Sequence, residues 1–557
     1  MIKQKILADL KQVLEDLDLP TTDIVCDISK NAKFGEYSTN IALQLAKMHI
    51  QKDKQSGVEI ANKISKKLGK PDYLQKVEVA TNGFINFFVK DEELIKNAQS
   101  LDLLKKSDRP QKILVEYGHV NPLKEIHIGH LRTFILGESL CRVFESLENQ
   151  VFRANYQGDI GLHIAKAIWG IKELGLPSKK LSLEEKAKFL GQAYANGSLK
   201  YDEDESVKKQ IDQINISLYQ KDPELKEVYE LARSWSLAYF EPIYELLGIK
   251  YDRCFFESEV FENGKKIVEE NIDKIFLKND GAVIFPGEKY GLHNRVFITS
   301  AGNPTYEAKE IGLAQLEYDS FNYEKSIHVV ASEQEGYFQV VIKAIELIFP
   351  YLAGKKYHLS FGVVDLKMGK MSSREGNVVT VDDLYHVVSE KVREITKQNR
   401  LKIDQETVRK ISLGAIKFSY LKYSPRPNIV FDIDQSVSLE GDSGPYVQYT
   451  YARIQSVLKN SKKGTEFADI NLEIHERAIL RALLYFPEIV EQAAVSLHPN
   501  LVTSFLLDLA KLYNVFYQEY RIIGSEKEEF RLHLSTEVGK VLKKGLNLLG
   551  IEAPERM

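Results

Sequence analysis

The chain has 557 residues, which at roughly 100–200 residues per domain is enough for about three or four domains. Its 44% hydrophobic and 28% charged residues are ordinary for globular proteins, and its net charge of −4 excludes a global positive field, so an RNA partner needs local basic patches. The three cysteines form no Cys-x-x-Cys pair, which excludes a zinc ribbon and a disulfide framework and favours a reducing compartment; they are Cys26, Cys141 and Cys254.

The first residues are typical of an amphipathic helix and not of a targeting segment. Apolar residues recur there at helical spacing: Ile2, Ile6, Leu7, Leu10, Val13 and Leu14. No signal-peptide core follows, and no run of about 18 apolar residues occurs. We therefore expect a cytoplasmic protein with no membrane partner.

Residues 1–105 are predicted to form a small α+β domain. Two strand-like runs, 77–80 and 84–89, flank Asn82-Gly83, a dipeptide that favours a hairpin turn. A lysine-rich join that contains Pro110 follows at 105–110 and predicts a linker.

The run 112–117 is short and apolar and predicts the first strand of a parallel sheet, with a helix opening near residue 129. In open sheets of this kind, ligands bind outside the carboxyl ends of the strands. That rule predicts a crevice that holds Glu116, Asn121 and His127.

His127 and His130 bracket Gly129 at the start of that helix. Neutral imidazoles donate hydrogen bonds to phosphate oxygens, and a glycine lets a nucleobase or ribose approach the backbone. The alternative is a metal site, because residues at i and i+3 share a helix face. A zinc site needs a further ligand, and none is evident in the sequence.

From about 175 to 290 the sequence becomes charged and helical, with Ser182 and Asp222 as expected helix caps. We interpret this stretch as an insertion between two halves of a nucleotide-binding fold. Strand-like runs return at 282–285, 326–331 and 358–364, and helical spacing dominates beyond about 386, which predicts a bundle.

The last of these strands leads into Lys370, Met371, Ser372, Ser373 and Arg374, between Gly369 and Gly376. A lysine, two hydroxyls and an arginine in such a loop provide donors for a pyrophosphate leaving group. A Walker loop is excluded, because Met371 follows the lysine where Ser or Thr is needed for magnesium.

The ordered pair of motifs resembles the signature of class I aminoacyl-tRNA synthetases. The surrounding residues 116–132, EYGHVNPLKEIHIGHLR, resemble the first catalytic segment of the arginyl-tRNA synthetase family. Four further stretches resemble the same family in the same order: 34–40 (FGEYSTN), 82–86 (NGFIN), 444–453 (GPYVQYTYAR) and 550–557 (GIEAPERM).

This resemblance implies a multidomain α/β fold, in which a Rossmann-type catalytic domain carries an N-terminal α+β domain and a C-terminal helical bundle. The expected boundaries are 1–105 for a domain that recognises the tRNA elbow, 106–385 for the catalytic domain with its insertion at about 175–290, and 386–557 for an anticodon-binding domain. The implied reaction uses ATP with Mg²⁺ to activate L-arginine and transfers it to tRNA(Arg). A monomer is expected.

The resemblance also implies the residue roles. ATP would contact His127, Gly129, His130 and the loop residues Lys370, Met371, Ser372 and Ser373. Arginine would contact Glu116, Asn121, His130, Tyr306, Glu310 and Gln334. Glu310 stands where the family usually has Asp, Glu116 could instead be a strand-end residue paired to a lysine, and Gln334 could contact adenosine.

The loop departs from the family-wide pattern, because Ser373 stands where a second lysine is usual. Arginyl enzymes that lack this lysine typically carry one three residues ahead of the first motif, where this chain has Lys124. An ammonium can contact phosphate from either side, so we expect Lys124 to act in catalysis with His127, His130 and Lys370. The alternative is a solvated loop lysine.

A second departure lies at 158–163, where Ile160 and His163 stand at positions that often hold Trp and Gln. The turn of Gly158, Asp159 and Gly161 survives, and we interpret it as shaping the backbone.

For tRNA, Tyr446, Tyr449 and Arg453 fall on one helix face, where they could stack on anticodon bases or pack in a core. Asn40 and Phe84 are the expected contacts of the N-terminal domain.

Three other functions compete with arginyl transfer. A class I synthetase for another amino acid would not need acidic residues such as Glu116 and Glu310. A pantothenate-type ligase would be about half this length and would lack a long helical tail. A non-catalytic RNA-binding relative would not need His127, Gly129, His130 and Lys370 intact.

Overall fold

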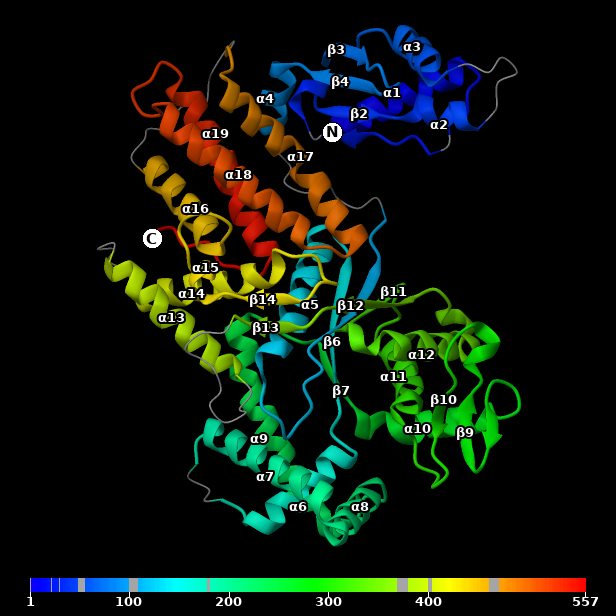
Figure 1. Ribbon diagram of the computed structural model, residues 1–557. Coiled ribbons are helices and arrows are strands. Elements are labelled where there is room, and N and C mark those ends of the chain that lie inside the picture. The colour runs from blue at the N-terminus through cyan, green and yellow to red at the C-terminus, as the bar shows by residue number, and fades with distance from the viewer. Residues whose placement is uncertain are drawn as a thin grey trace. The chain divides into compact units, whose positions relative to one another are not determined.

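A computed structural model gives the fold of the chain (Figure 1). It describes residues 2–21, 23–29, 31–48, 56–99, 109–177, 181–367, 379–398, 403–459 and 470–557. None of the helices in these ranges is long and apolar enough to cross a membrane.

The chain divides into two compact units. Unit 1 consists of Met1–Leu104, Arg453–Ile489 and Asp508–Leu542, and unit 2 consists of Lys105–Ala452, Val490–Leu507 and Lys543–Met557. The N-terminal region therefore shares unit 1 with segments from the end of the chain. Three long helices contribute to both units: α17 (Ile474–Ser496), α18 (Asn500–Glu519) and α19 (Glu528–Leu548).

Unit 1 contains an antiparallel sheet with the order β1-β2-β4-β3. The predicted hairpin is confirmed, because Gly83 turns the chain at a φ of 86° between β3 and β4. The predicted first helix is α1. The elements are α1 (Ile2–Asp16), β1 (Asp27–Ile28), β2 (Tyr37–Thr39), α2 (Ile41–Lys47), α3 (Gly57–Leu68), β3 (Leu74–Val79), β4 (Ile85–Val89) and α4 (Asp91–Gln99).

The segment around Glu36 attaches this sheet to α17. The buried carboxylate of Glu36 accepts hydrogen bonds from the backbone N–H of Val89, at 2.7 Å, and from Arg477, at 2.8 Å. Beside it, the Tyr37 hydroxyl donates to Glu488 at 2.6 Å. Gly35 has a φ of 74°, and a Cβ there would lie 2.2 Å from the carbonyl oxygen of Phe87. This motif therefore joins two elements that are distant in sequence.

Unit 2 is built on a parallel five-stranded sheet with the order β12-β11-β5-β6-β7, as the sequence predicts for a nucleotide-binding fold. The strands are β5 (Lys112–Glu116), β6 (Gln150–Gln157), β7 (Arg253–Phe256), β11 (Lys325–Ala331) and β12 (Lys356–Phe361). The helices that follow β5 and β6 are α5 (Ile128–Ser146) and α6 (Leu162–Leu174).

The side chains of β5 alternate between the two faces of the sheet. Leu114 belongs to the core shared with α10 (Glu257–Glu270), α11 (Tyr306–Ser320) and α12 (Glu335–Ile348). Glu116 has the same parity and points to that face. Tyr117 points to the α5 face, where its hydroxyl donates to Glu138 at 2.8 Å.

The chain leaves β5 towards β6 and leaves β11 towards β12, so the strand order reverses between two neighbours, β5 and β11. Ligands of open parallel sheets bind at this switch point, outside the carboxyl ends of the strands. Glu116 ends β5, and Gln334 follows β11 closely in the turn Ser332–Gln334. The topology therefore places Glu116 and Gln334 at the switch point, where a ligand site is expected.

The predicted helical insertion is shorter than the expected range of about 175–290. It consists of α7 (Leu183–Glu203), α8 (Glu205–Tyr219) and α9 (Pro223–Leu247), whereas β7, also within that range, pairs with β6 in the parallel sheet. Ser182 and Asp222 cap α7 and α9 as expected. Helices α6 and α7 pack closely, because a Cβ at Gly170 or Gly197 would lie 2.0 Å from a backbone oxygen of the other helix.

The predicted strand at 282–285 does not join the parallel sheet. It forms β9 (Ala282–Phe285) of a separate antiparallel sheet with β8 (Leu277–Asn279) and β10 (Arg295–Ile298). Its short apolar run predicts a strand, but the pairing of that strand depends on neighbours that the run itself does not specify.

The rest of unit 2 is mostly helical, as predicted beyond residue 386, apart from the strand pair β13 (Val364–Leu366) and β14 (Ile429–Phe431). The helices are α13 (Val381–Gln398), α14 (Gln405–Leu421), α15 (Ile433–Ser436) and α16 (Gly444–Lys459), of which the last reaches into unit 1.

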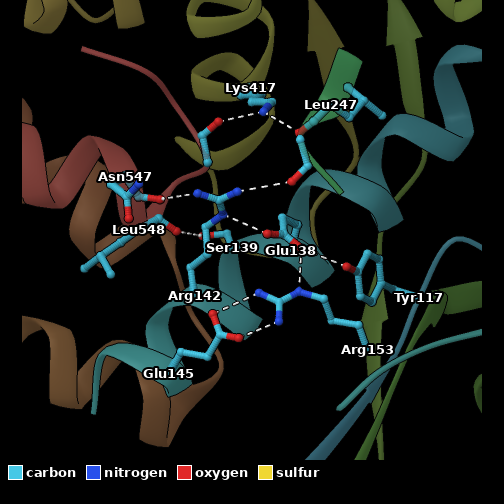
Figure 2. A network of polar contacts seen from close by, with 12 residues as sticks. Tyr117, Glu138, Ser139, Arg142, Glu145, Arg153, Leu247, Lys417, Asn547 and Leu548 are labelled. Carbon is cyan, nitrogen blue, oxygen red and sulfur yellow. Dashed lines mark hydrogen bonds and ion pairs between the residues drawn. The ribbon is translucent and has the colours of Figure 1, made fainter. Parts of the chain in front are cut away.

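Figure 2 shows how the C-terminal segment is attached to α5. Arg142 donates to Glu138 at 2.7 Å and to the carbonyl oxygen of Asn547 at 3.4 Å. Lys417 on α14 donates to the carbonyl oxygens of Leu247 and Gly550, at 2.7 and 2.6 Å (Figure 2). Burial lowers the pKa of Lys417 to about 7. The helix that opens at the candidate site is thus braced from several elements.

Candidate active site

The loop between β5 and α5 is held by hydrogen bonds from three elements. The N–H of Gly118 donates to Thr133, that of His119 to Asn155 and that of Leu123 to Ser236, at 3.1, 3.1 and 2.7 Å. His119 and Leu123 have positive φ values of 54° and 68°, which cost free energy in residues other than glycine. This loop is therefore fixed in an unfavourable backbone conformation beside the strand end.

His127 caps α5 and orients both imidazoles. Its Nδ1 accepts from the N–H of Gly129 at 3.1 Å, and its own N–H donates to Nδ1 of His130 at 3.2 Å. The two rings lie 3.7 Å apart, and a Cβ at residue 129 would lie 2.9 Å from the His127 ring. Since both Nδ1 atoms accept, each neutral ring carries its proton on Nε2, as a donor.

The two imidazoles are neutral at physiological pH. Burial, helped by His127 and Lys124, lowers the pKa of His130 to about 3, and burial together with Lys124 lowers the pKa of His127. Neutral Nε2–H donors at the N-terminus of a helix suit an anionic phosphate. Backbone N–H groups occupy both Nδ1 atoms, so the Nε2 atoms are the ones available to a ligand.

The loop residues Lys370, Met371, Ser372 and Ser373 lie outside the described residues. The chain that follows them is tied to the first motif. The N–H of Ile128 donates to the carbonyl oxygen of Val379, and the N–H of Val381 donates to that of Ile126, both at 3.1 Å. Residue 379 is therefore adjacent to the start of α5, although the motifs are distant in sequence.

Lys124 lies close to the histidine pair. Its Nζ is 4.7 Å from the centre of the Tyr194 ring on α7, and its charge contributes to the lowered pKa of His127 and of His130. A cation over an aromatic face is attracted to it. The insertion helix thus holds Lys124 beside the expected phosphate site.

Glu116 lies at the end of β5 with 1% of its surface exposed. Its Oε1 is 3.3 Å from Nδ1 of His328 and 3.5 Å from Nδ1 of His119. Its Oε2 has no hydrogen-bond partner among the described residues. The alternative is that Glu116 is a strand-end residue paired to a lysine. The lysine nearby is buried Lys356, but it donates its hydrogen bond to Glu317 and not to Glu116.

Glu310 points to the same buried region. Burial, and then the negative charge of Glu116, raise the pKa of Glu310 well above its usual range. Tyr306, one turn earlier on α11, is 54% exposed and lies near Lys309, whose Nζ is 4.9 Å from its ring. The structure therefore brings Glu116 and Glu310 together and leaves Tyr306 at the exposed start of the helix.

Asn121 and Gln334 differ in their contacts and exposure. The amide oxygen of Asn121 accepts from the N–H of Gly158 at 2.9 Å, so its NH₂ group is the half that would face a ligand. Gln334 is exposed after β11.

The turn of Gly158, Asp159 and Gly161 shapes the backbone, as expected. Asp159 is fully buried and accepts hydrogen bonds from Tyr229 and Arg233 on α9, at 3.0 and 2.9 Å. Gly161 begins α6 with a φ of 128°. His163 donates to the carbonyl oxygen of Gly158 at 2.8 Å, and burial lowers its pKa to about 4.

Three residues that surround Glu116 are not among the site residues predicted from the sequence: Glu317, His328 and Lys356. A signal was present in the strand patterns, because His328 and Lys356 are polar residues on strands whose other face is apolar. In the sheet, His328 lies directly opposite Glu116 and Lys356 lies opposite Ser326.

The residues expected to contact tRNA are all half-buried. On α16, Tyr446, Tyr449 and Arg453 are half-buried, whereas most of their neighbours are buried. Within unit 1, Arg453 donates to Asn514 and lies 5.2 Å from the Tyr517 ring. Also in unit 1, Asn40 and Phe84 are half-buried, and Oδ1 of Asn40 has no partner among the described residues.

Three family models match the chain in order. The arginyl tRNA synthetase N-terminal domain matches residues 1–89, the catalytic domain of class I (R) tRNA synthetases matches 93–433, and the DALR anticodon-binding domain matches 447–557. The parallel sheet, its switch point and the histidine-capped helix lie within the catalytic match. Together they define a class I aminoacyl-tRNA synthetase.

Relatives narrow the class further. The chain is 32% identical to an arginine–tRNA ligase of Bacteroides thetaiotaomicron over 518 residues, 85% of this chain and 86% of the relative. It is 30% identical to that of Halothermothrix orenii over 577 residues, with 100% and 99% covered. The solved arginyl-tRNA synthetase of Thermus thermophilus matches over all of both chains with a TM-score of 0.85 and 26% identity. The chain belongs to the arginyl-tRNA synthetase family.

Proposed function

We propose that this protein ligates L-arginine to tRNA(Arg) in two steps, with arginyl-adenylate as the intermediate and AMP and pyrophosphate as products. The observation that carries the proposal is the arrangement at the switch point. Buried carboxyl groups of Glu116 and Glu310 lie beyond the end of β5, and neutral Nε2–H donors lie at the start of α5. The carboxyl groups suit a guanidinium, and the Nε2–H donors suit phosphates.

In the first step, the carboxylate of arginine attacks the α-phosphorus of ATP, and pyrophosphate leaves. The chemistry depends on positioning and on donors that face the developing charge. His127 and His130 provide two such donors, and Gly129 leaves room beside the His127 ring. Lys124 and Lys370 are proposed to contact the pyrophosphate.

Magnesium is proposed to arrive with ATP. Mg²⁺ prefers oxygen ligands and in such sites is held largely by substrate phosphates and water. Within the described ranges, the cluster with metal-like spacing is Glu116, Glu317 and His328, which lies in the arginine region.

The arginine pocket is proposed to consist of Glu116, Asn121, His130, Tyr306, Glu310 and Gln334. A guanidinium presents five donors in a planar fork, and the unpartnered Oε2 of Glu116 offers an acceptor for it. Glu310 is already buried beside Glu116, so the longer side chain that replaces the usual Asp still reaches the pocket.

In the second step the arginyl group passes to the 3′-terminal ribose of tRNA. We propose that Tyr446, Tyr449 and Arg453 contact the anticodon region and that Asn40 and Phe84 contact the elbow. The expected domain boundaries at 105 and 385, a cytoplasmic location and a monomeric state are part of the same proposal.

The test is an aminoacylation panel in which total tRNA from a relative such as Bacteroides thetaiotaomicron is offered each standard amino acid with ATP and magnesium. Arginine alone should be charged. Efficient charging of another amino acid, with none of arginine, would overturn the proposal.

A further inference from the structure

Three carboxyl groups meet at the buried end of the proposed arginine pocket. Glu116 comes from β5, and Glu310 and Glu317 come from one face of α11, seven residues or about two turns apart. All three are buried, with exposed fractions of 1%, 8% and 0%. The cation that contacts them is Lys356, whose Nζ donates to Oε2 of Glu317 at 2.7 Å.

His328 connects the lysine to Glu116. Its Nε2 lies 3.0 Å from Nζ of Lys356, and its Nδ1 lies 3.3 Å from Oε1 of Glu116. An ammonium can only donate, so Nε2 accepts and the neutral ring carries its proton on Nδ1, which lies near Glu116 but has no hydrogen-bond partner among the described residues. Burial and the charge of Lys356 lower the pKa of His328 well below its usual range, which keeps the ring neutral.

Polar atoms in this cluster remain without partners among the described residues. They include Oε2 of Glu116 and Oε1 of Glu317, together with the hydroxyl oxygens of Tyr156 and Tyr323. A buried acceptor without a donor is costly, and native proteins rarely keep several together. A ligand with several N–H donors would satisfy them.

The charges do not balance without a ligand. Three ionised carboxylates against one ammonium leave two negative charges in a buried region, which is strongly unfavourable. Accordingly, burial raises the pKa of Glu116 and of Glu310, and burial together with Glu116 raises that of Glu317 to about 7. A side-chain hydrogen bond between Glu116 and Glu317 is among the causes that set both pKa values, so the two carboxyl groups are placed to share a proton.

We propose that the guanidinium of arginine enters this cluster in exchange for a proton held between Glu116 and Glu317, and that Glu317, His328 and Lys356 are positioning residues for Glu116. The inference rests on the proposed function and adds how the pocket is kept ready for a cation. One O–H bond breaks, the proton passes to solvent, and the guanidinium charge takes its place, so the net charge of the cluster is unchanged.

The alternative occupant of this cluster is a divalent cation, bound by the carboxylate oxygens of Glu116 and Glu317 and a ring nitrogen of His328. Lys356 argues against this, because its ammonium contacts both Glu317 and His328. A metal ion at that place would meet a positive charge at hydrogen-bond distance.

Several other groups face the cluster and belong in any account of its pH dependence. They are His119 in the loop, Ser326 on β11, Tyr156 on β6, Tyr323 before β11, Tyr337 on α12 and the ion pair of Glu257 and Lys309. Burial lowers the pKa of His119 to about 4 and raises those of the tyrosines, so His119 and the tyrosines do not change charge between pH 6 and 8.

The proposal is tested by arginine binding to the full-length protein, without ATP or tRNA, measured calorimetrically between pH 6 and 8. Release of one proton makes the Kd fall by up to tenfold per pH unit. Titrations in two buffers of different ionisation enthalpy should report the release of nearly one proton per arginine bound at pH 6 and of about half a proton at pH 7, where a group with a pKa of about 7 is half protonated. A Kd that does not change with pH, in protein that binds arginine, would overturn the proposal.

The variant Glu317→Gln removes one of the two carboxyl groups that are proposed to share the proton. The substituted amide can accept from Lys356 and donate to Glu116, which keeps Glu116 ionised in the empty pocket, so the dependence of Kd on pH should fall below half of the wild-type slope. Glu138→Gln is the matched control, because Glu138 is also a buried, ion-paired carboxylate but lies on the α5 face of the sheet (Figure 2). Equal slopes in wild type and Glu317→Gln would rule out the proposed exchange.

The outcomes separate this inference from the proposed function. If the protein binds or charges no arginine, the proposed function fails. If arginine is charged but its binding exchanges no proton, only the inference fails. Loss of arginine binding after treatment with EDTA, restored by a divalent cation, would assign the cluster to a metal and overturn the inference as well.

Discussion

Lys124 lies over the ring of Tyr194, and its charge contributes to the lowered pKa of both histidines that open α5. Since Ser373 cannot carry charge, we expect the leaving pyrophosphate to depend on Lys124 and Lys370. Lys124→Ala should lower kcat and kcat/KM together by about 100- to 1000-fold, or roughly 3–4 kcal/mol, because the contact forms mainly in the transition state. The KM for ATP should change little in steady-state aminoacylation.

The companion variant is Lys124→Ala combined with Ser373→Lys. It should recover part of the rate, since the restored charge reaches the same phosphates from the loop. If Lys124→Ala alone charges tRNA at nearly the wild-type rate, Lys124 is a solvated loop residue.

At this scale, the sequence predicted the residues whose chemistry depends on near neighbours along the chain. His127, Gly129 and His130 lie within four consecutive residues at the start of one helix, and their hydrogen bonds are local. Glu317, His328 and Lys356 meet Glu116 through strand register and helix packing, and the apolar runs around them specify neither. Their proximity to Glu116 follows from the sheet order, which places β11 beside β5.

Among the elements, α16 carries the aromatic pair proposed to meet the anticodon. Tyr446→Ala and Tyr449→Ala should raise the KM for tRNA and leave those for arginine and ATP nearly unchanged, because loss of one stacking partner costs about 1–3 kcal/mol per base. Aminoacylation kinetics with each substrate varied in turn provide the measurement. A lowered melting temperature with unchanged KM would favour a packing role for the two tyrosines.

Lys417 on α14 connects two carbonyl oxygens and holds the segment after α19 near α5 (Figure 2). Its pKa is about 7 when folded and 10.5 when solvated, so between these values the unfolded chain binds more protons and the free energy of unfolding rises with pH. Relative to Lys417→Met, the wild type should gain up to about 1.4 kcal/mol per pH unit between pH 7 and 9.

Urea unfolding of both proteins at pH 7, 8 and 9 measures this difference. A constant difference across the three pH values would mean that Lys417 keeps its charge in the folded state.

The sequence predicts helices and strands well where a few neighbouring residues determine them. The helices capped by Ser182 and Asp222 and the hairpin at Gly83 follow from short sequence signals. Strand 282–285 was found as a strand, but its membership of a separate antiparallel sheet depends on β8 and β10, which no local pattern indicates.

At the scale of the molecule, the N-terminal sheet and part of the C-terminal helices form one compact unit. Glu36 is central to it, because it binds Arg477 on α17 and the backbone of β4. Glu36→Ala leaves the N–H of Val89 and a half-buried guanidinium without their acceptor, which should cost about 1–3 kcal/mol. Thermal unfolding followed by calorimetry should show the loss.

Glu78→Ala is a suitable control in the same sheet, since Glu78 is exposed and pairs only with exposed Lys76. Equal unfolding temperatures for the two variants would mean that Glu36 does not hold the sheet to α17.

We propose that buried carboxyl groups select the charge of arginine for transfer to tRNA. The most direct measurement compares the charging of tRNA with arginine and with citrulline, which has nearly the same shape but a neutral ureido group. We expect arginine to be charged and citrulline to be rejected by about 10⁴-fold in kcat/KM, because a neutral ligand leaves buried charged acceptors unpaired. Charging of citrulline within about tenfold of arginine would contradict the account.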